Sequence, residues 1–218
     1  MPWSLSKYGL YKKCPTAYKF RHVDRLPDPA GPAAQRGTDI HAMLEGYLAT
    51  GNWTLAIPEF TIKKAEAMRG LNFRSEIKLA LDENWKRVEW NAPEAWVRGI
   101  IDAMVLLPDN GDVPPTEAQL GEWKTGKVYD DHVNQRDLYL TMVLSIWPTI
   151  DYGKIETIYV DQSHAQASEL KREELEAKQI HWTKAVTPML NDTFFSPRPG
   201  DHCRWCTFSK RKGGPCVF

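Results

Sequence analysis

A predicted hairpin constrains the fold of this chain more than any other feature of its sequence. Residues 96–107 and 118–125 are rich in branched and apolar side chains, as β-strands are. The turn sequence Pro108-Asp109-Asn110-Gly111 follows the first segment, and Asn-Gly is a strong signal for a turn between antiparallel strands. We therefore expect the two segments to pair side by side in a sheet.

Three charged residues lie within these apolar segments. Glu122 and Lys124 are two positions apart and so project from the same face of their strand, and pairing places Asp102 at the same end of the hairpin. Burial of such charges is costly unless a cation offsets them. Mg²⁺ or Mn²⁺, bound by the two carboxylates and the backbone carbonyl of Trp123, would do so and would activate a water that Lys124 orients. A surface ion pair is the alternative interpretation of Glu122 and Lys124 taken alone.

Helical patterns on either side of the hairpin supply further candidates. From Ala34 to a predicted stop at Gly51, apolar residues recur at helical spacing, and His41 falls on their packed side. His41 is therefore either a hydrogen-bonded core residue or a metal ligand. On the helix predicted over residues 134–147, Gln135 and Tyr139 lie one turn apart, where their amide and hydroxyl groups could bond a DNA phosphate or the lysine.

The remaining segments predict a mixed α/β fold. We expect a short helix that runs from an N-cap at Ser6 toward Cys14, and a break or a new helical start at Pro15. The patterns also predict helices over residues 63–85, with an interruption at Gly70 as an alternative, and over residues 169–191, and strands over residues 88–90 and 155–160. This order of elements indicates a central sheet covered by helices.

The size and composition of the chain indicate one globular domain. It has 218 residues, of which 42% are apolar and 26% are charged. We find no apolar run long enough to span a membrane and no secretory signal, so we expect a cytoplasmic protein with no membrane partner. A net charge of zero does not by itself indicate nucleic-acid binding, although residues 11–22 and 210–212 are basic and the first of these segments is also rich in aromatic residues.

The four cysteines indicate a metal site. Cys203 and Cys206 form a Cys-x-x-Cys pair, Cys216 follows nearby, and Cys14 lies near the start of the chain. In a reducing compartment such a set predicts metal binding rather than disulfides. Four thiolates suit either a [4Fe–4S] cluster or a structural Zn²⁺, and unligated buried thiols are the remaining alternative.

Taken in order, these segments resemble the motif series of the RecB-like and Cas4-like nucleases in the PD-(D/E)XK superfamily. The opening of the chain, from Ser4-Leu5-Ser6 to Cys14-Pro15-Thr16-Ala17-Tyr18, is also similar to the N-terminal segment of that family. The series comprises Arg36-Gly37 with His41, Gly99-Ile100-Ile101-Asp102, Glu122-Trp123-Lys124-Thr125-Gly126, and Gln135-Arg136-Asp137-Leu138-Tyr139.

The resemblance implies a restriction-endonuclease-like fold, a mixed central sheet flanked by helices, in one nuclease domain over residues 1–218. It implies that Lys124 is catalytic, that Gln135 and Tyr139 support the site, and that Glu76 is a loose match to a further acidic position. The metal ligands that it implies are His41, Asp102, Glu122 and the carbonyl of Trp123.

The resemblance also implies an iron–sulfur clamp. In such family members one cysteine before the nuclease core and three after it bind a [4Fe–4S] cluster that ties the C-terminal tail to the N-terminal helix. Here these are Cys14 and, within residues 200–218, Cys203, Cys206 and Cys216. The gap from Cys206 to Cys216 is longer than in many cluster members, so zinc remains the alternative metal.

The function implied is that of a metal-dependent DNA nuclease, an exonuclease that processes single-stranded or duplex DNA ends in recombination, repair or replication. Recombination or replication proteins and further copies of the chain are the candidate protein partners. A small chain without a P-loop fits a phage or mobile-element origin, with action in the host cytoplasm. The alternative is a DNA-binding module that keeps the fold and does not cut. A zinc hydrolase is disfavoured because four cysteines would leave the ion no open position for water.

Overall fold

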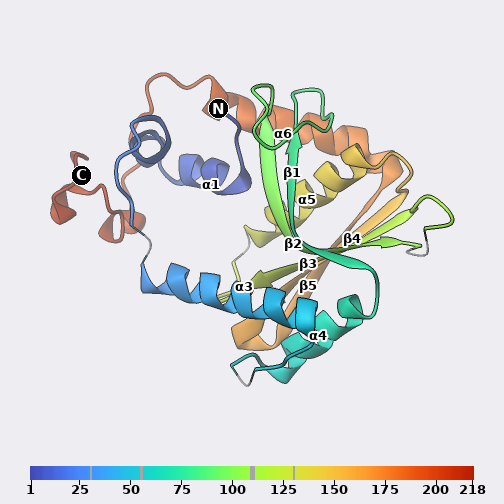
Figure 1. Ribbon diagram of the computed structural model, residues 1–218. Helices are drawn as coiled ribbons and strands as arrows, with labels where there is room; N and C mark the ends of the chain where they lie inside the picture. Colours follow the sequence, from blue (N-terminus) through green and yellow to red (C-terminus); the bar gives the residue numbers. More distant parts are fainter. Residues whose placement is uncertain (30, 55, 109–110, 130) are drawn as a thin grey trace. The chain divides into compact units, whose positions relative to one another are not determined.

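The computed structural model describes residues 1–29, 31–54, 56–108, 111–129 and 131–218, and these form two compact units (Figure 1). The first, here called the sheet unit, comprises residues 1–2 and 31–180. The second, the terminal unit, comprises residues 3–30 and 181–218 and therefore joins the two ends of the chain. None of the helices in the described part of the chain has the length and apolar composition needed to cross a membrane.

The sheet unit is built on one mixed sheet of five strands in the order β1-β2-β3-β4-β5. The pair β3 and β4 is parallel and the other pairs are antiparallel, so the predicted mixed α/β class is confirmed. Helix α5 (His132–Ile146) connects the parallel pair, as such a crossover requires. The strands are β1 (Phe73–Leu81), β2 (Val97–Leu107), β3 (Glu117–Lys124), β4 (Tyr152–Tyr159) and β5 (His164–Lys171).

The predicted hairpin corresponds to β2 and β3. Their antiparallel ladder runs from Leu107 opposite Glu117 to Ala103 opposite Gly121. Two residues of the predicted turn, Asp109 and Asn110, lie outside the described residues. The first half of β2 pairs with β1 alone, and the two strands project past β3 as an arm (Figure 1).

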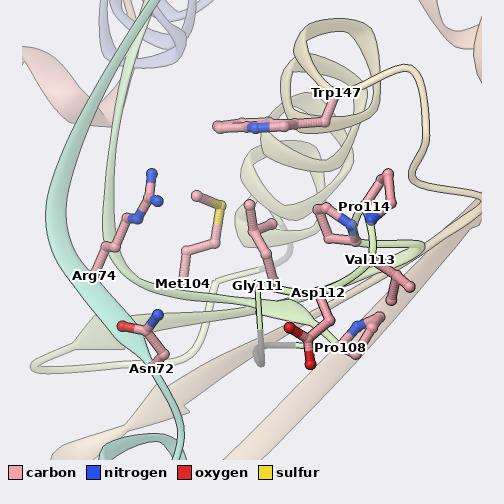
Figure 2. A pocket seen from close by; sticks show the side chains of 11 residues that line it. Asn72, Arg74, Met104, Pro108, Gly111, Asp112, Val113, Pro114 and Trp147 are labelled. Carbon is pink, nitrogen blue, oxygen red and sulfur yellow. The ribbon is translucent and has the colours of Figure 1, made fainter.

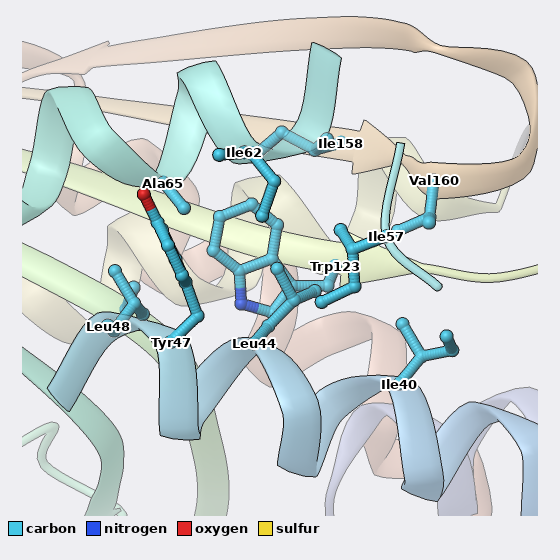
Figure 3. Packing of buried hydrophobic residues seen from close by; sticks show 11 residues of the cluster. Ile40, Leu44, Tyr47, Leu48, Ile57, Ile62, Ala65, Trp123, Ile158 and Val160 are labelled. Carbon is cyan, nitrogen blue, oxygen red and sulfur yellow. The ribbon is translucent and has the colours of Figure 1, made fainter. Parts of the chain in front are cut away.

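The core of the sheet unit lies at two helix–sheet interfaces. Helices α3 (Pro32–Thr50) and α4 (Glu59–Arg69) cover one face, where Trp123 of β3 packs among their apolar side chains (Figure 3). Helix α5 packs against β4 and β5. Gly153 permits close approach there, because a Cβ atom at this position would lie 2.9 Å from atoms of Leu140 and Leu144. Strand alternation thus directs neighbouring residues of β3 toward different helices.

The helix predicted over residues 63–85 is wrong in its second half. Helix α4 ends at Arg69 with Gly70 as its C-cap, and the chain continues as β1. The strand predicted over residues 88–90 is wrong as well, since the β contact that the structure describes in this connection is an isolated bridge between Leu81 and Arg87. The Asp82 side chain accepts hydrogen bonds from two backbone amides here and holds a turn instead of a strand.

The helix predicted over residues 169–191 starts too early. Residues 169–171 complete β5, and α6 (Leu175–Leu190) begins only after a 3-10 turn. β5 is an edge strand with mostly polar, exposed side chains, so its sequence lacks the apolar alternation of a buried strand. The predicted strand over residues 155–160 is confirmed as β4, which starts three residues earlier, at Tyr152.

The terminal unit begins with α1 (Leu5–Lys13) and α2 (Pro15–Tyr18). The predicted helix and the new start at Pro15 are confirmed, but the N-cap is Ser4 rather than Ser6, since the Ser4 hydroxyl accepts from a backbone amide of the first turn.

Hydrogen bonds join the two chain ends within the terminal unit. The Tyr11 hydroxyl donates to the Asp192 carboxylate at 2.8 Å, and the Thr16 hydroxyl donates to the Phe195 carbonyl at 2.5 Å. Segments separated by more than 170 residues are thereby held together by hydrogen bonds.

Candidate active site

Two buried carboxylates mark the point where β2 and β3 stop pairing. Asp102 and Glu122 occupy the rung next to the last pair of the ladder, and their exposed fractions are only 7% and 3%. Asp102 turns into the space between the strands, where its Oδ2 accepts a hydrogen bond of 2.7 Å from the backbone amide of Trp123. The convergence predicted for the hairpin is therefore present, and it depends on the strands separating at this rung.

One oxygen of Glu122 is satisfied by two neighbours. Its Oε1 accepts from Lys124 Nζ at 2.7 Å and from Gln135 Nε2 at 2.6 Å. Gln135 also donates to the hydroxyl of Tyr139 at 3.1 Å, so the two residues predicted one turn apart on α5 support the same carboxylate. The other oxygen, Oε2, is buried and has no hydrogen-bond partner among the described residues. A buried carboxylate oxygen without a partner is costly, and a bound cation would satisfy it.

Helix α3 brings His41 to the same place. Its Nε2 lies 2.9 Å from the carbonyl oxygen of Trp123, and its Nδ1 lies 3.4 Å from Asp102 Oδ1. A carbonyl oxygen can only accept, so His41 donates from Nε2 to Trp123, while its Nδ1 faces Asp102.

Glu76 is placed at this site as well. One carboxylate oxygen of Glu76, one of Asp102 and one ring nitrogen of His41 lie within 4.8 Å of one another, whereas Glu122 lies outside this group. Glu76 stands opposite Asp102 in the β1–β2 register and has a positive φ of 49°, which is unusual for a residue in a strand. Sequence spacing gave only a loose match for Glu76, because neither the register of β1 nor this backbone conformation has a local signature.

Negative charge is concentrated at this site. Burial, together with the neighbouring Asp102 carboxylate, raises the pKa of Glu122 to about 7, although Lys124 opposes the shift. A hydrogen bond with Asp102 raises the pKa of His41 against the opposing effect of burial. Burial and the charges of Asp102 and Glu45 raise the pKa of Glu76. All three shifts favour protonation, which is the response of carboxylates held together without a cation.

An ion pair anchors the loop that follows Lys124. Arg36 binds Asp161 through both guanidinium nitrogens, at 2.9 Å and 2.5 Å. Asp161 also accepts from the backbone amide of Gly126 at 2.7 Å. The start of α3 is thereby tied to the end of β3. The motif series contains Arg36, but its partner lies 125 residues away, and no local pattern around Asp161 indicates the contact.

The four cysteines are free thiols of the terminal unit. Burial raises the pKa of Cys206, and the nearby thiols of Cys14, Cys216 and Cys203 raise it further. The sulfur atoms are more widely spaced than a compact site requires, since the described cysteines form no group of three with ligand atoms within 4.8 Å of one another.

A hollow of about 480 Å³ lies between the second half of β2, residues 111–115 and Trp147 at the end of α5 (Figure 2). Its walls include Arg74, Met104, Val113 and Trp147. None of the predicted site residues lines this hollow, so it is separate from the carboxylate site.

The family model of the PD-(D/E)XK nuclease superfamily matches residues 2–211. The chain belongs to this superfamily. The match includes every motif of the predicted series, so the predicted nuclease family and its restriction-endonuclease-like fold are confirmed. The RecB-like or Cas4-like subtype stays a prediction, as do the catalytic and ligand roles of the individual residues.

Several solved structures are similar to this PD-(D/E)XK chain at low sequence identity. A protein from Eubacterium rectale named "Putative exonuclease" is 11% identical, with 100% of this chain and 89% of that chain covered and a TM-score of 0.50. SSO0001 is 17% identical over 99% and 86%, with a TM-score of 0.49. The alkaline exonuclease LHK-Exo from Laribacter hongkongensis is 11% identical over 87% and 90%, with a TM-score of 0.37. The comparison with curated proteins finds no match.

We expect Glu122→Gln to stabilise the metal-free protein at pH 8 but not at pH 4. The folded-state pKa of Glu122 is raised to about 7, so folding is penalised as pH rises through the interval between the unfolded value and 7. The neutral amide avoids this penalty, and its oxygen can still accept from Lys124 and Gln135. The gain in the free energy of unfolding should be on the order of 2 kcal/mol at pH 8.

Urea denaturation in EDTA at both pH values measures this gain. Glu117→Gln, at the exposed start of β3, is the matched control and should show no such dependence. A gain that is the same at pH 4 and pH 8 would show that the Glu122 carboxylate is not destabilised by its surroundings.

Proposed function

We propose that this chain is a metal-dependent deoxyribonuclease that hydrolyses phosphodiester bonds at DNA ends as an exonuclease. The observation that carries the proposal is a buried carboxylate oxygen, Glu122 Oε2, that has no hydrogen-bond partner among the described residues and lies in a group of metal-binding atom types beside a lysine. The other atoms of this group are Asp102 Oδ1, the Trp123 carbonyl oxygen and the imidazole nitrogens of His41, which contact one another. The superfamily and the exonuclease names of two of the solved structures support the same activity.

The donor set fits Mg²⁺ or Mn²⁺. Hard divalent cations prefer carboxylate and carbonyl oxygens, and Mn²⁺ also accepts an imidazole. Asp102, Glu122, His41 and the Trp123 carbonyl would hold the ion, and Glu76 lies close enough to His41 and Asp102 to join them. When bound, the ion supplies an activated water and offsets charge on the scissile phosphate.

Lys124 would position the water and stabilise the charge that develops on the phosphate. Its side chain is only 24% exposed and its ammonium group is fixed by Glu122, so its position is set before substrate binds. Glu122 is in turn fixed by Gln135, which Tyr139 orients from the next turn of α5. Burial raises the pKa of Tyr139, so its hydroxyl remains a neutral hydrogen-bonding group.

The rival function is a DNA-binding module that keeps the fold and does not cut. Retention of both carboxylates, the lysine and an orphaned carboxylate oxygen argues against it, since a binding module has no use for a strained charge cluster. In both cases the protein binds DNA. We expect it to act in the cytoplasm, in recombination, repair or replication.

We predict that Lys124→Ala abolishes metal-dependent cleavage and leaves DNA binding unchanged. Removal of one stabilising donor should lower kcat by roughly 100- to 1000-fold. Cleavage of end-labelled single-stranded and duplex DNA with Mn²⁺, Mg²⁺ or EDTA measures the effect, and the labelled products give the polarity of digestion. Lys63→Ala, on the exposed face of α4, is the control for loss of one positive charge.

Failure of the wild type to cut with either metal, with DNA binding intact, would favour the binding module. Equal cleavage by wild type and Lys124→Ala would contradict the role of the lysine.

We further propose that Cys14, Cys203, Cys206 and Cys216 bind a [4Fe–4S] cluster and that the whole chain acts as one nuclease domain. The thiols of Cys14, Cys203 and Cys216 act on Cys206, so the four thiols lie near one another in the terminal unit. Four such thiolates suit a [4Fe–4S] cluster, and a structural zinc is the alternative metal.

We expect Cys14→Ser to lower iron content and thermal stability more than it lowers turnover per folded molecule. Ligation energy contributes to folding, so the melting temperature should fall by roughly 5–10 °C. Elemental analysis of anaerobically purified protein, thermal melting and a cleavage assay measure the three quantities, with Thr207→Ala as the control. An unchanged melting temperature with lost turnover in Cys14→Ser would contradict a structural role for the cluster. Stoichiometric zinc instead of iron in the wild type would show that the site binds the alternative metal.

A further inference from the structure

An aromatic ring flanked by two cations lies on the arm formed by β1 and β2. Trp90, in the connection between the two strands, is half-buried. The Arg98 guanidinium lies 5.1 Å from the centre of its ring and the Lys78 ammonium lies 6.0 Å from it. These three residues are here called the tryptophan platform.

The platform shares a strand face with the carboxylate site. Side chains alternate along β2, and the half-exposed Arg98 and Ile100 alternate with the buried Val97, Gly99 and Ile101. Asp102 continues the series of Arg98 and Ile100. Four residues separate Arg98 from Asp102, which corresponds to about 13 Å along a strand. That distance equals about four stacked nucleotides.

Strand β1, next to β2, also carries one residue of the platform and one residue of the carboxylate site. Lys78 pairs with Ile100, and Glu76 occupies the position opposite Asp102. The charge of Lys78 lowers the pKa of Glu76, which places the cation of the platform within electrostatic reach of the carboxylate cluster.

The two cations of the platform are not neutralised within the described structure. Neither Lys78 nor Arg98 forms an ion pair with a carboxylate of the described residues. The Nε atom of Arg98 is buried and lacks a hydrogen-bond partner there as well. The unpaired charges of Lys78 and Arg98 favour an anionic ligand, since a phosphate accepts hydrogen bonds from ammonium and guanidinium groups readily.

We propose that the tryptophan platform binds an unpaired strand of the DNA substrate. A nucleobase stacks on the exposed part of Trp90, while Arg98 and Lys78 contact the flanking phosphates. Bases of an intact duplex stack on each other and are closed to Trp90, so the platform selects single strands or single-stranded overhangs. This inference rests on the proposed nuclease function and specifies its substrate.

The test compares Trp90→Leu with Trp90→Phe. Both replacements are apolar and fill the position, so a purely structural role would treat them alike, whereas stacking requires the ring of phenylalanine. Fluorescence anisotropy in EDTA with a labelled oligothymidylate and with a blunt duplex gives both affinities. Trp53→Ala, at another tryptophan with an exposed fraction of 54%, is the matched control.

We expect Trp90→Leu to weaken single-strand binding about 10-fold, with less than a 3-fold change for the duplex, because base stacking on an aromatic ring contributes about this much. Trp90→Phe should retain most of the affinity, and Arg98→Gln should weaken binding and reduce its dependence on salt. Hydrolysis of the small diester bis(p-nitrophenyl) phosphate with Mn²⁺ should not change in any of these variants.

Equal single-strand affinity of wild type and Trp90→Leu would overturn the platform, as would an equal loss in the leucine and phenylalanine variants. A parallel loss of diester hydrolysis would assign Trp90 a structural role and would overturn it too. A wild type that binds single strands through Trp90 but hydrolyses neither DNA nor the diester would refute the nuclease function and leave the platform standing.

Discussion

The hydrogen bond from the Trp123 backbone amide to Asp102 is the contact on which the site depends. The backbone pairing of β2 and β3 ends at Ala103 and Gly121, and beyond it the Asp102 side chain, not the backbone of β2, accepts from the Trp123 amide. The strands therefore separate where the charged residues begin. The carbonyl oxygen of the same residue lies 2.9 Å from His41 Nε2. Without the Trp123 amide, Asp102 would keep only the longer contact with His41 Nδ1, at 3.4 Å, and a buried carboxylate with so few donors is far more costly than an exposed one.

Because side chains alternate along β3, its neighbouring residues contact different helices on the two faces of the sheet. The Trp123 side chain packs among α3 and α4, and this packing fixes the strand against the helix that carries His41 (Figure 3). Glu122 and Lys124 point the other way, and Gln135 of α5 reaches Glu122 from there. The charged cluster is therefore held between two packed layers, which keeps the carboxylates close together although burial and their mutual repulsion raise the pKa of Glu122.

Sequence patterns predicted this part of the structure because it depends on residues that are close together in the sequence. The β2–β3 pair, the spacing of Glu122 and Lys124 and the inward face of α3 follow from alternation and helical periodicity, and the nuclease family follows from the order of the motifs. Strands β1 and β5 were not predicted, because the helical pattern was extended past the break at Gly70 into β1 and because β5 is a polar edge strand. The contact of Asp161 and the placement of Glu76 depend on register and on residues distant in sequence, which a single sequence does not encode locally.

Anomalous diffraction from crystals soaked in Mn²⁺ tests the central claim most directly, because it locates the cation independently of any activity. The account predicts an anomalous peak about 2.1 Å from Asp102 Oδ1, with Glu122 Oε2 and the Trp123 carbonyl among its ligands. The peak should disappear in Asp102→Asn. A peak elsewhere, or none at a Mn²⁺ concentration that supports cleavage, would contradict the view that this carboxylate cluster exists to hold a divalent cation.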